Sequence, residues 1–258
     1  MREFLEDAHQ HRDDGYGRAQ RQLKENLPKR FYTEVGVGTV GEGFAVTLDG
    51  KTPRTPGQKP VIVPRRAIAE TMAAEWAAQG KFIDPETMPT VRLINSAVEA
   101  GDERLDALRA EIVKYAGNDL LLYRAEGPSS LVAEQEKHWD GALVKLARHF
   151  GIGFQPTVGL LHQAQPQSTI DRLERAVADI GLFEAVAMVS LVGITGSGLL
   201  IIAHREGLLD PEEVWAAAHV DEDHNIRLWG EVHEATERRS KNRRDYDAAL
   251  KVLEAIRS

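Results

Sequence analysis

The first part of the chain alternates hydrophobic and polar residues over short runs, which is the pattern of β-strands with one buried face. Such runs occur at 31–35 and 44–48, and they predict two strands. Asp49 and Gly50 follow the second run. This pair predicts a tight two-residue turn into a return strand at 51–54, because both central residues of a type I′ turn need positive φ.

From Pro64 onward, hydrophobic residues recur every three or four positions, which is the spacing of helices with one buried face. The predicted helices cover 64–79, 91–100, 105–115, 130–150, 168–177, 182–192 and 197–205, and further helical segments run from 211 to the end. The start at Asp210-Pro211 is well specified, because a capping Asp precedes Pro at the first helical position and acids fill the first turn.

The Gly- and Pro-containing run at 126–130 is the best candidate for a linker. We therefore predict an α+β protein with a polar tail at 1–28, an N-terminal β-rich α/β domain at 29–126 and a C-terminal all-helical domain at 127–258. The tail does not resemble a targeting signal, because it carries several acidic residues and no apolar core.

One hydrophobic segment, Ala185 to Ala203, has no charged residue over a length that approaches a membrane span. Ser190, Thr195 and Ser197 interrupt it, and no aromatic belt flanks it. We expect a pair of helices buried inside the helical domain, with a membrane span as the alternative.

The composition narrows the classes of function. The chain of 258 residues has 32 Lys and Arg against 40 Asp and Glu, a formal net charge of −8, which disfavours a general nucleic-acid binder. The chain has no cysteine, so disulfides, thiolate zinc sites, iron–sulfur clusters and a cysteine nucleophile are excluded.

Gly36, Gly38 and Gly41 have the spacing of a dinucleotide-binding loop. That loop binds a pyrophosphate only where a helix begins directly after it. Here the strand-like run 44–48 follows, so we interpret the glycines as part of a hairpin and keep a nucleotide-binding protein as a minor alternative.

A second candidate for chemistry is the cluster of His219, Asp221, Asp223 and His224, whose side chains offer nitrogen and oxygen ligands for a metal. The cluster lies inside a helical pattern at Val214–Arg239, on which only His219 and Asp223 share a face closely. We expect no metal here, and a metal-dependent hydrolase that uses these four residues is the alternative function.

Glu222 is the most informative residue of that helical pattern. On a helical wheel it falls in the middle of the apolar face formed with Trp215, Ala218, Ile226 and Trp229. A carboxylate on an apolar stripe costs free energy unless it is paired. Two interpretations stay open, a buried structural partner of an arginine or a contact to another protein or a ligand. Core packing is the expected role of the tryptophans, which are Trp76, Trp139, Trp215 and Trp229.

The order and spacing of many short segments resemble one known family, the ATP synthase assembly chaperones that escort the α subunit of the catalytic sector. The segments that carry the resemblance are Lys29–Tyr32, Leu48–Lys51, Thr55-Pro56, Ala74–Trp76 with Gln79, Met88-Pro89, Asn95, Asp119–Leu121, Tyr123-Arg124, Gln135, Trp139-Asp140, Gly196-Ser197, Asp221-Glu222, Trp229-Gly230 and Glu234-Ala235. The chain departs from the family pattern at Gly141, at Asp223–Asn225 and at Val232.

The resemblance implies a chaperone with no enzymatic activity and no dependence on a nucleotide, and we expect no cofactor or metal. From the acidic composition and the interrupted apolar segment we expect no nucleic-acid partner and no insertion into membranes. The chaperone's expected client is the free α subunit, which it would keep from aggregating until the β subunit pairs with it. The expected location is the bacterial cytoplasm, or the mitochondrial matrix in eukaryotic relatives. The family's acidic functional position matches Asp221-Glu222, and together with Trp229 and Glu234 these residues form the expected client-binding site.

Overall fold

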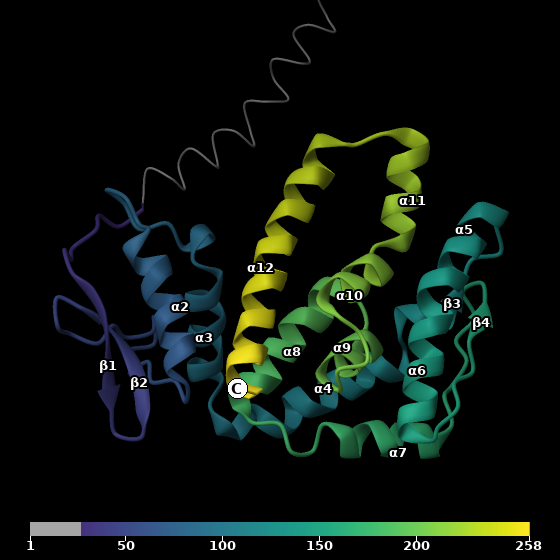
Figure 1. The fold of residues 1–258 in the computed structure, drawn as a ribbon, viewed down its shortest axis with the longest axis horizontal. Coiled ribbons are helices and arrows are strands. Elements are labelled where there is room, and N and C mark those ends of the chain that lie inside the picture. The colour runs from purple at the N-terminus through teal and green to yellow at the C-terminus, as the bar shows by residue number, and fades with distance from the viewer. Residues whose placement is uncertain (1–26, 258) are drawn as a thin grey trace, which may run out of the picture.

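The computed structural model describes residues 27–257. Residues 1–26 of the predicted polar tail lie outside the described residues. The N-terminal part is an antiparallel hairpin of β1 (Val35–Val40) and β2 (Gly43–Leu48), against which α2 (Arg66–Ala77) packs, with α3 (Pro89–Ala100) next to α2. Val46 of β2 and Ile68 of α2 are buried in this packing. Figure 1 shows this part at the left of the molecule.

The turn after β2 has the predicted geometry. Asp49 and Gly50 both have positive φ, 47° and 77°. Leu48 and Lys51, which flank them, exchange backbone hydrogen bonds of 2.8 and 3.0 Å. The prediction of a two-residue turn at Asp49-Gly50 is confirmed.

The rest of the chain is mostly helical. It contains α4 (Leu105–Gly117), β3 (Tyr123–Arg124), α5 (Ser129–Gln135), a π-helical turn (Glu136–Asp140), α6 (Gly141–Phe150), β4 (Thr157–Val158), α7 (Gln167–Ala176), α8 (Leu182–Thr195), α9 (Gly198–Arg205), α10 (Pro211–Ala218), α11 (Val220–Trp229) and α12 (His233–Arg257). Short 3₁₀ turns lie at Pro85–Thr87, Asp102–Arg104 and Leu120–Leu122. β3 and β4 pair in parallel. The predicted fold class, strands in the N-terminal part followed by a helical part, is confirmed.

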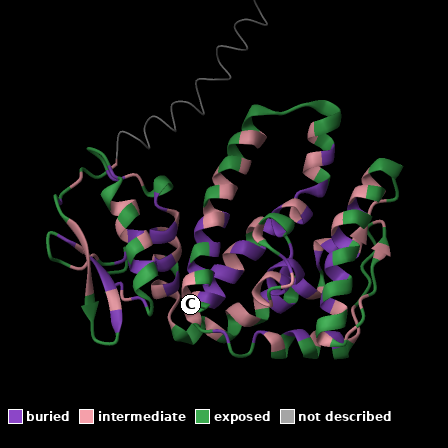
Figure 2. Cartoon of the chain, in the orientation of Figure 1, coloured by how far each residue is buried: buried purple, intermediate pink, exposed green. Residues whose placement is uncertain are grey.

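α8 and α9 lie at the centre of the helical part. α8 packs against α3, α4 and α12, and α9 packs against α4, α6 and α10. Most residues of both helices are buried, as Figure 2 shows in purple. The prediction of a buried helix pair at Ala185–Ala203 is confirmed. Within residues 27–257 we find no helix with the length and apolar character needed to cross a membrane.

The helical pattern at Val214–Arg239, which the helical wheel treats as one helix, is divided in the structure. The structure breaks it at His219 and again at Gly230, into α10, α11 and the start of α12. At His219 the backbone leaves helical geometry with φ −115° and ψ 16°. Gly230 has φ 81°, which glycine adopts without strain. The helical wheel therefore placed Trp215 and Trp229 on one face although they belong to different helices.

Candidate functional site

α11, the connection to α12 and the first turns of α12 rise above the body of the molecule as an arch, visible at the top of Figure 1. We call residues 220–239 the α11–α12 arch. Exposed residues predominate along its top, which is green in Figure 2, whereas the lower part of α12 packs against α3 and α8. All four predicted site residues lie on this arch.

The top of the arch is apolar. Leu228, Trp229 and Val232 expose 57%, 84% and 63% of their surface. The expectation that Trp229 packs in the core is wrong, because α11 ends at Gly230 and leaves the indole beyond its last packed turn. The other tryptophans are buried or half-buried as expected: Trp76, Trp139 and Trp215. A large aromatic side chain in solvent beside two aliphatic ones is typical of a surface that another molecule covers.

The surface between α11 and α12 is hollowed. The hollow has a volume of about 440 Å³ and is lined by Glu222, Asn225, Ile226, Trp229, Gly230, Val232, Ala235 and Arg238. Its wall is largely aliphatic and aromatic, while Glu222 and Arg238 each add one charge of opposite sign. The structure thus brings Glu222 and Trp229, two of the four predicted site residues, to the same hollow.

Glu222 is paired with an arginine of the facing helix. The Nη1 atom of Arg239 lies 3.4 Å from Oε2 of Glu222 and 2.5 Å from Oδ1 of Asp223. The Glu222 side chain still exposes 30% of its surface. Because Asp223 is the closer partner, Arg239 keeps a carboxylate beside it even without Glu222. The arginine partner expected for Glu222 exists, and the carboxylate nevertheless stays accessible from the hollow.

Asp221 and Glu234 lie outside the hollow. Oδ1 of Asp221 accepts a hydrogen bond of 2.8 Å from Nε2 of Gln135, a buried residue of α5. The same amide accepts a hydrogen bond of 2.8 Å from the backbone N–H of Ala125. Asp221 therefore anchors the foot of α11 to α5, whereas Glu234 is exposed in the first turn of α12.

The four candidate metal ligands are not gathered into a site. The His219 ring stacks on Trp215 with ring centres 3.9 Å apart, and burial lowers the pKa of His219. His224 is buried and faces Glu134 at 3.6 Å. Among residues 27–257, no group of three or more His, Asp or Glu side chains is placed to hold a metal ion. The geometry gives no support to the alternative of a metal-dependent hydrolase.

The glycine motif lies in the N-terminal hairpin. Gly36 and Gly38 belong to β1, and Gly41, with φ 59°, lies in the turn that leads into β2. A strand follows the motif directly, so it offers no helix N-terminus to a pyrophosphate.

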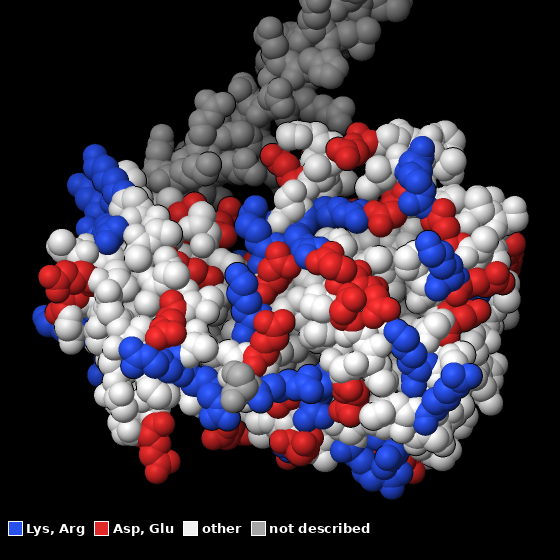
Figure 3. Space-filling view, viewed as in Figure 1, with Lys and Arg blue, Asp and Glu red and all other residues white. Residues whose placement is uncertain are grey.

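Charged side chains of both signs are interspersed over the face drawn in Figure 3. What distinguishes the hollow from the surrounding surface is therefore its apolar wall and not a concentration of side chains of one charge. Two residues of this surface are not among the predicted site residues: Arg238, which lines the hollow, and the exposed Leu228, which precedes Trp229 in the chain. The signal that could have identified them is Gly230, since glycine after an apolar residue marks a helix end.

Comparison with known proteins gives consistent matches. Residues 29–147 match the sequence model of the ATP12 chaperone protein family. The crystal structure of the Atu1473 protein from Agrobacterium tumefaciens is similar with a TM-score of 0.86 and 39% identity, covering 93% of this chain and 90% of that chain. Two crystal structures of Atp12 from Paracoccus denitrificans, one of them a point variant, are similar with TM-scores of 0.77 and 32% identity, covering 88% of this chain and 96% of theirs.

These matches define the class of protein, which is a chaperone and not an enzyme. The identity to a solved relative extends over nearly the whole chain. The chain belongs to the ATP12 chaperone family, whose members act in the assembly of ATP synthase. The resemblance seen in the sequence is confirmed.

Proposed function

We propose that this chaperone binds the free α subunit of the ATP synthase catalytic sector and keeps it from aggregating until the β subunit pairs with it. Subunits of stable oligomers bury large apolar interfaces, which associate wrongly when they are left uncovered. Release would follow when the β subunit competes for the covered surface. We place this activity in the bacterial cytoplasm, as the family resemblance implies.

The observation that carries the proposal is the exposed Trp229 beside the hollow of the arch. Tryptophan is among the residues that dominate binding energy in protein interfaces, surrounded by weaker contacts that exclude water. Leu228 and Val232 extend the apolar area, and Arg238 lies at its polar rim, which is the usual anatomy of an interface. The proposed client contacts are, in order of expected weight, Trp229, Glu222, Glu234 and Asp221.

Replacing Trp229 by alanine should raise the Kd for purified α subunit about 30-fold or more, the loss expected for a residue that contributes at least ~2 kcal/mol. The free energy of unfolding should change by less than about 0.5 kcal/mol, because the side chain is 84% exposed. The matched control is Phe31→Ala, which removes an aromatic ring that is 71% exposed outside the arch. If the Trp229→Ala protein folds and its Kd for the α subunit is unchanged, the arch is not the client-binding site.

Glu222→Gln tests the carboxylate, because it keeps the shape of the side chain and removes its charge. We expect the Kd for the α subunit to rise about tenfold, the scale of one hydrogen bond to a charged group. Stability should fall by less than about 1 kcal/mol, since Asp223 remains beside Arg239. The matched control is Asp223→Asn, which makes the same change one residue away, outside the lining of the hollow.

The outcome that would assign Glu222 a structural role is also defined. The Glu222→Gln protein would then melt early, and its ability to keep the α subunit in solution would fall only in proportion to the folded fraction. Circular dichroism and urea unfolding measure the folded fraction independently of the client.

A further inference from the structure

A second exposed apolar surface lies on the loop between α6 and α7. Leu160 and Leu161 expose 96% and 82% of their surface, and Val158 exposes 63%. We call residues 155–165 the Leu160 loop. No Lys, Arg, Asp or Glu occurs between His149 and Ile170, although 28% of the residues of the chain are charged. The loop therefore presents aliphatic side chains from an uncharged stretch.

Polar contacts hold this loop in one shape. The backbone N–H of Gln155 donates to Oε1 of Gln165 at 2.9 Å, and Nε2 of Gln165 donates to the backbone carbonyl of Gln155 at 3.0 Å, so this pair closes the base of the loop. The backbone N–H of Gly159 donates to the carbonyl of Arg124 in β3 at 2.9 Å. A loop that is fixed before binding loses little conformational entropy when a partner covers it.

The Leu160 loop and the arch both contact the segment formed by β3 and α5. β4 lies within the loop and pairs with β3, and Nδ1 of His162 lies 2.9 Å from the hydroxyl of Tyr123 in β3. β3 leads into α5, whose Gln135 is hydrogen-bonded to both Ala125 and Asp221. Figure 1 shows β4, α5 and α11 in the same half of the molecule, opposite to β1 and β2.

We infer that the Leu160 loop is a second client contact, which takes an aliphatic, uncharged patch of the same α subunit that the arch holds. This inference rests on the proposed function. The exposed leucines suit an aliphatic partner surface, because a charged group that Leu160 and Leu161 covered would lose its hydration without a compensating partner. Three side chains cover much less than the roughly 800 Å² per partner of a stable interface, so the loop adds to a larger contact instead of forming a dimer by itself.

The test is the double variant Leu160→Ser/Leu161→Ser. We expect its Kd for purified α subunit to rise at least about tenfold, since two leucine side chains no longer leave water on binding. Its circular dichroism spectrum and Tm should match those of the unmodified protein, because both side chains are exposed. The matched control is Val40→Ser, which removes an exposed aliphatic side chain from the N-terminal hairpin and should leave the Kd unchanged.

The outcomes separate this inference from the proposed function. An unchanged Kd for the folded double variant, together with a raised Kd for Trp229→Ala, would overturn the Leu160 contact and leave the proposed function standing. Failure of the unmodified protein to bind the α subunit would overturn both. A dimer of the unmodified protein that the double variant dissociates in sedimentation would assign the loop to a second copy of this chain and overturn the client contact.

Discussion

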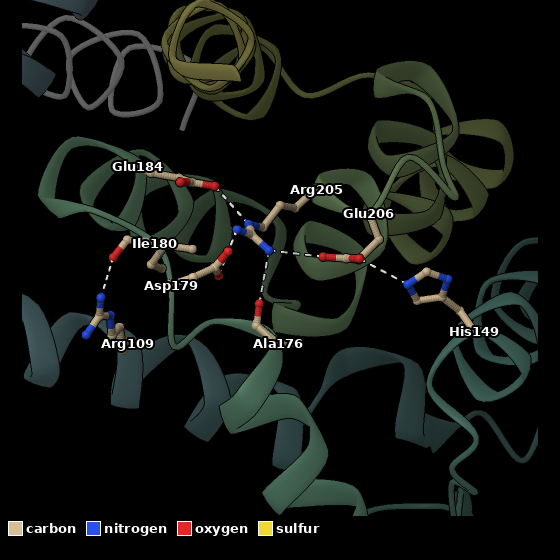
Figure 4. A network of polar contacts seen from close by, with 8 residues as sticks. All are labelled: Arg109, His149, Ala176, Asp179, Ile180, Glu184, Arg205 and Glu206. Atoms are coloured by element: carbon tan, nitrogen blue, oxygen red, sulfur yellow. Dashed lines mark hydrogen bonds and ion pairs between the residues drawn. The ribbon is translucent and has the colours of Figure 1, made fainter. Parts of the chain in front are cut away.

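Replacing Arg205 by alanine should lower the free energy of unfolding by about 3–5 kcal/mol, because it leaves a buried carboxylate without its partner. Nε of Arg205 donates to Oε1 of Glu184 at 2.8 Å, and the two side chains expose 16% and 10% of their surface. The same guanidinium also donates to Asp179, Glu206 and the carbonyl of Ala176, each at 3.0 Å. Figure 4 shows these contacts converging on Arg205. One side chain thus joins α9 to α8 and to the end of α7.

Two variants test whether the unpaired charge is the cause. The double variant Arg205→Met/Glu184→Leu should recover most of the lost stability, since neither side chain is then a buried charge. Arg66→Ala is the matched control, because Arg66 pairs with Glu70 on the surface and its loss should cost less than about 0.5 kcal/mol. Urea unfolding measures all of these. If Arg205→Ala costs no more than Arg66→Ala, the network does not stabilise the packing of these helices.

Elements with a turn or capping signal in the sequence are predicted correctly. The turn at Asp49-Gly50 is one, and the start of α10 is another, where Asp210 and Glu213 form a reciprocal capping box. Strand alternation, by contrast, misplaces two strands. The run 31–35 ends where β1, which covers Val35–Val40, begins, and 51–54 forms only isolated bridges at Lys51 and Arg54.

The break at His219 has no turn or capping signal. The His219 side chain lies 2.8 Å from the backbone carbonyl of Trp215 and stacks on its indole ring. The spacing of hydrophobic residues does not reveal these contacts, so it predicts no helix end at His219.

Many residues that carry the family resemblance join elements far apart in the sequence. The Glu75 carboxylate of α2 accepts hydrogen bonds of 2.8 Å from the backbone N–H groups of Thr90 and Val91 at the start of α3. The indole N–H of Trp139 donates to the carbonyl of Ala217 at 2.8 Å. A single sequence shows these residue types but not their partners, so these pairings could not be predicted from it.

The candidate site was predictable only in part for the same reason. The acidic position at Glu222 and the aromatic at Trp229 stand out in the sequence, but the hollow between them depends on how α11 and α12 diverge after Gly230. The Leu160 loop had no signal, because its residues show neither helical spacing nor strand alternation over a useful length.

Asp119 is the other residue with a large expected effect. Asp119 is fully buried. The carboxylate accepts hydrogen bonds from Oγ of Ser197 at 2.7 Å and from the backbone N–H groups of Leu199 and Leu121 at 2.8 and 3.1 Å. It thereby joins the 3₁₀ turn after α4 to the start of α9. Burial raises the pKa of Asp119 to about 7, although these hydrogen bonds oppose the rise.

Stability should therefore depend on pH through Asp119. Between roughly pH 4 and pH 7 the folded protein keeps a proton on this carboxyl that the unfolded chain has lost, so the free energy of unfolding falls as pH rises through this window. Asp119→Asn cannot titrate, and it should cost about 1–3 kcal/mol at pH 5, because the amide nitrogen, unlike the hydroxyl oxygen of the neutral carboxyl, cannot accept a hydrogen bond from a backbone N–H.

The difference in unfolding free energy between the unmodified protein and Asp119→Asn is the quantity that isolates this group from all other titrations. Between pH 5 and pH 8 the unmodified protein should lose roughly 2–3 kcal/mol of stability relative to the variant, as measured by urea unfolding at each pH. A difference that stays constant over this range would mean that Asp119 is ionised throughout. The hydrogen bonds from Ser197, Leu199 and Leu121 would then outweigh the cost of burying the charge, and the junction between α4 and α9 would contribute the same stability at every pH in the range.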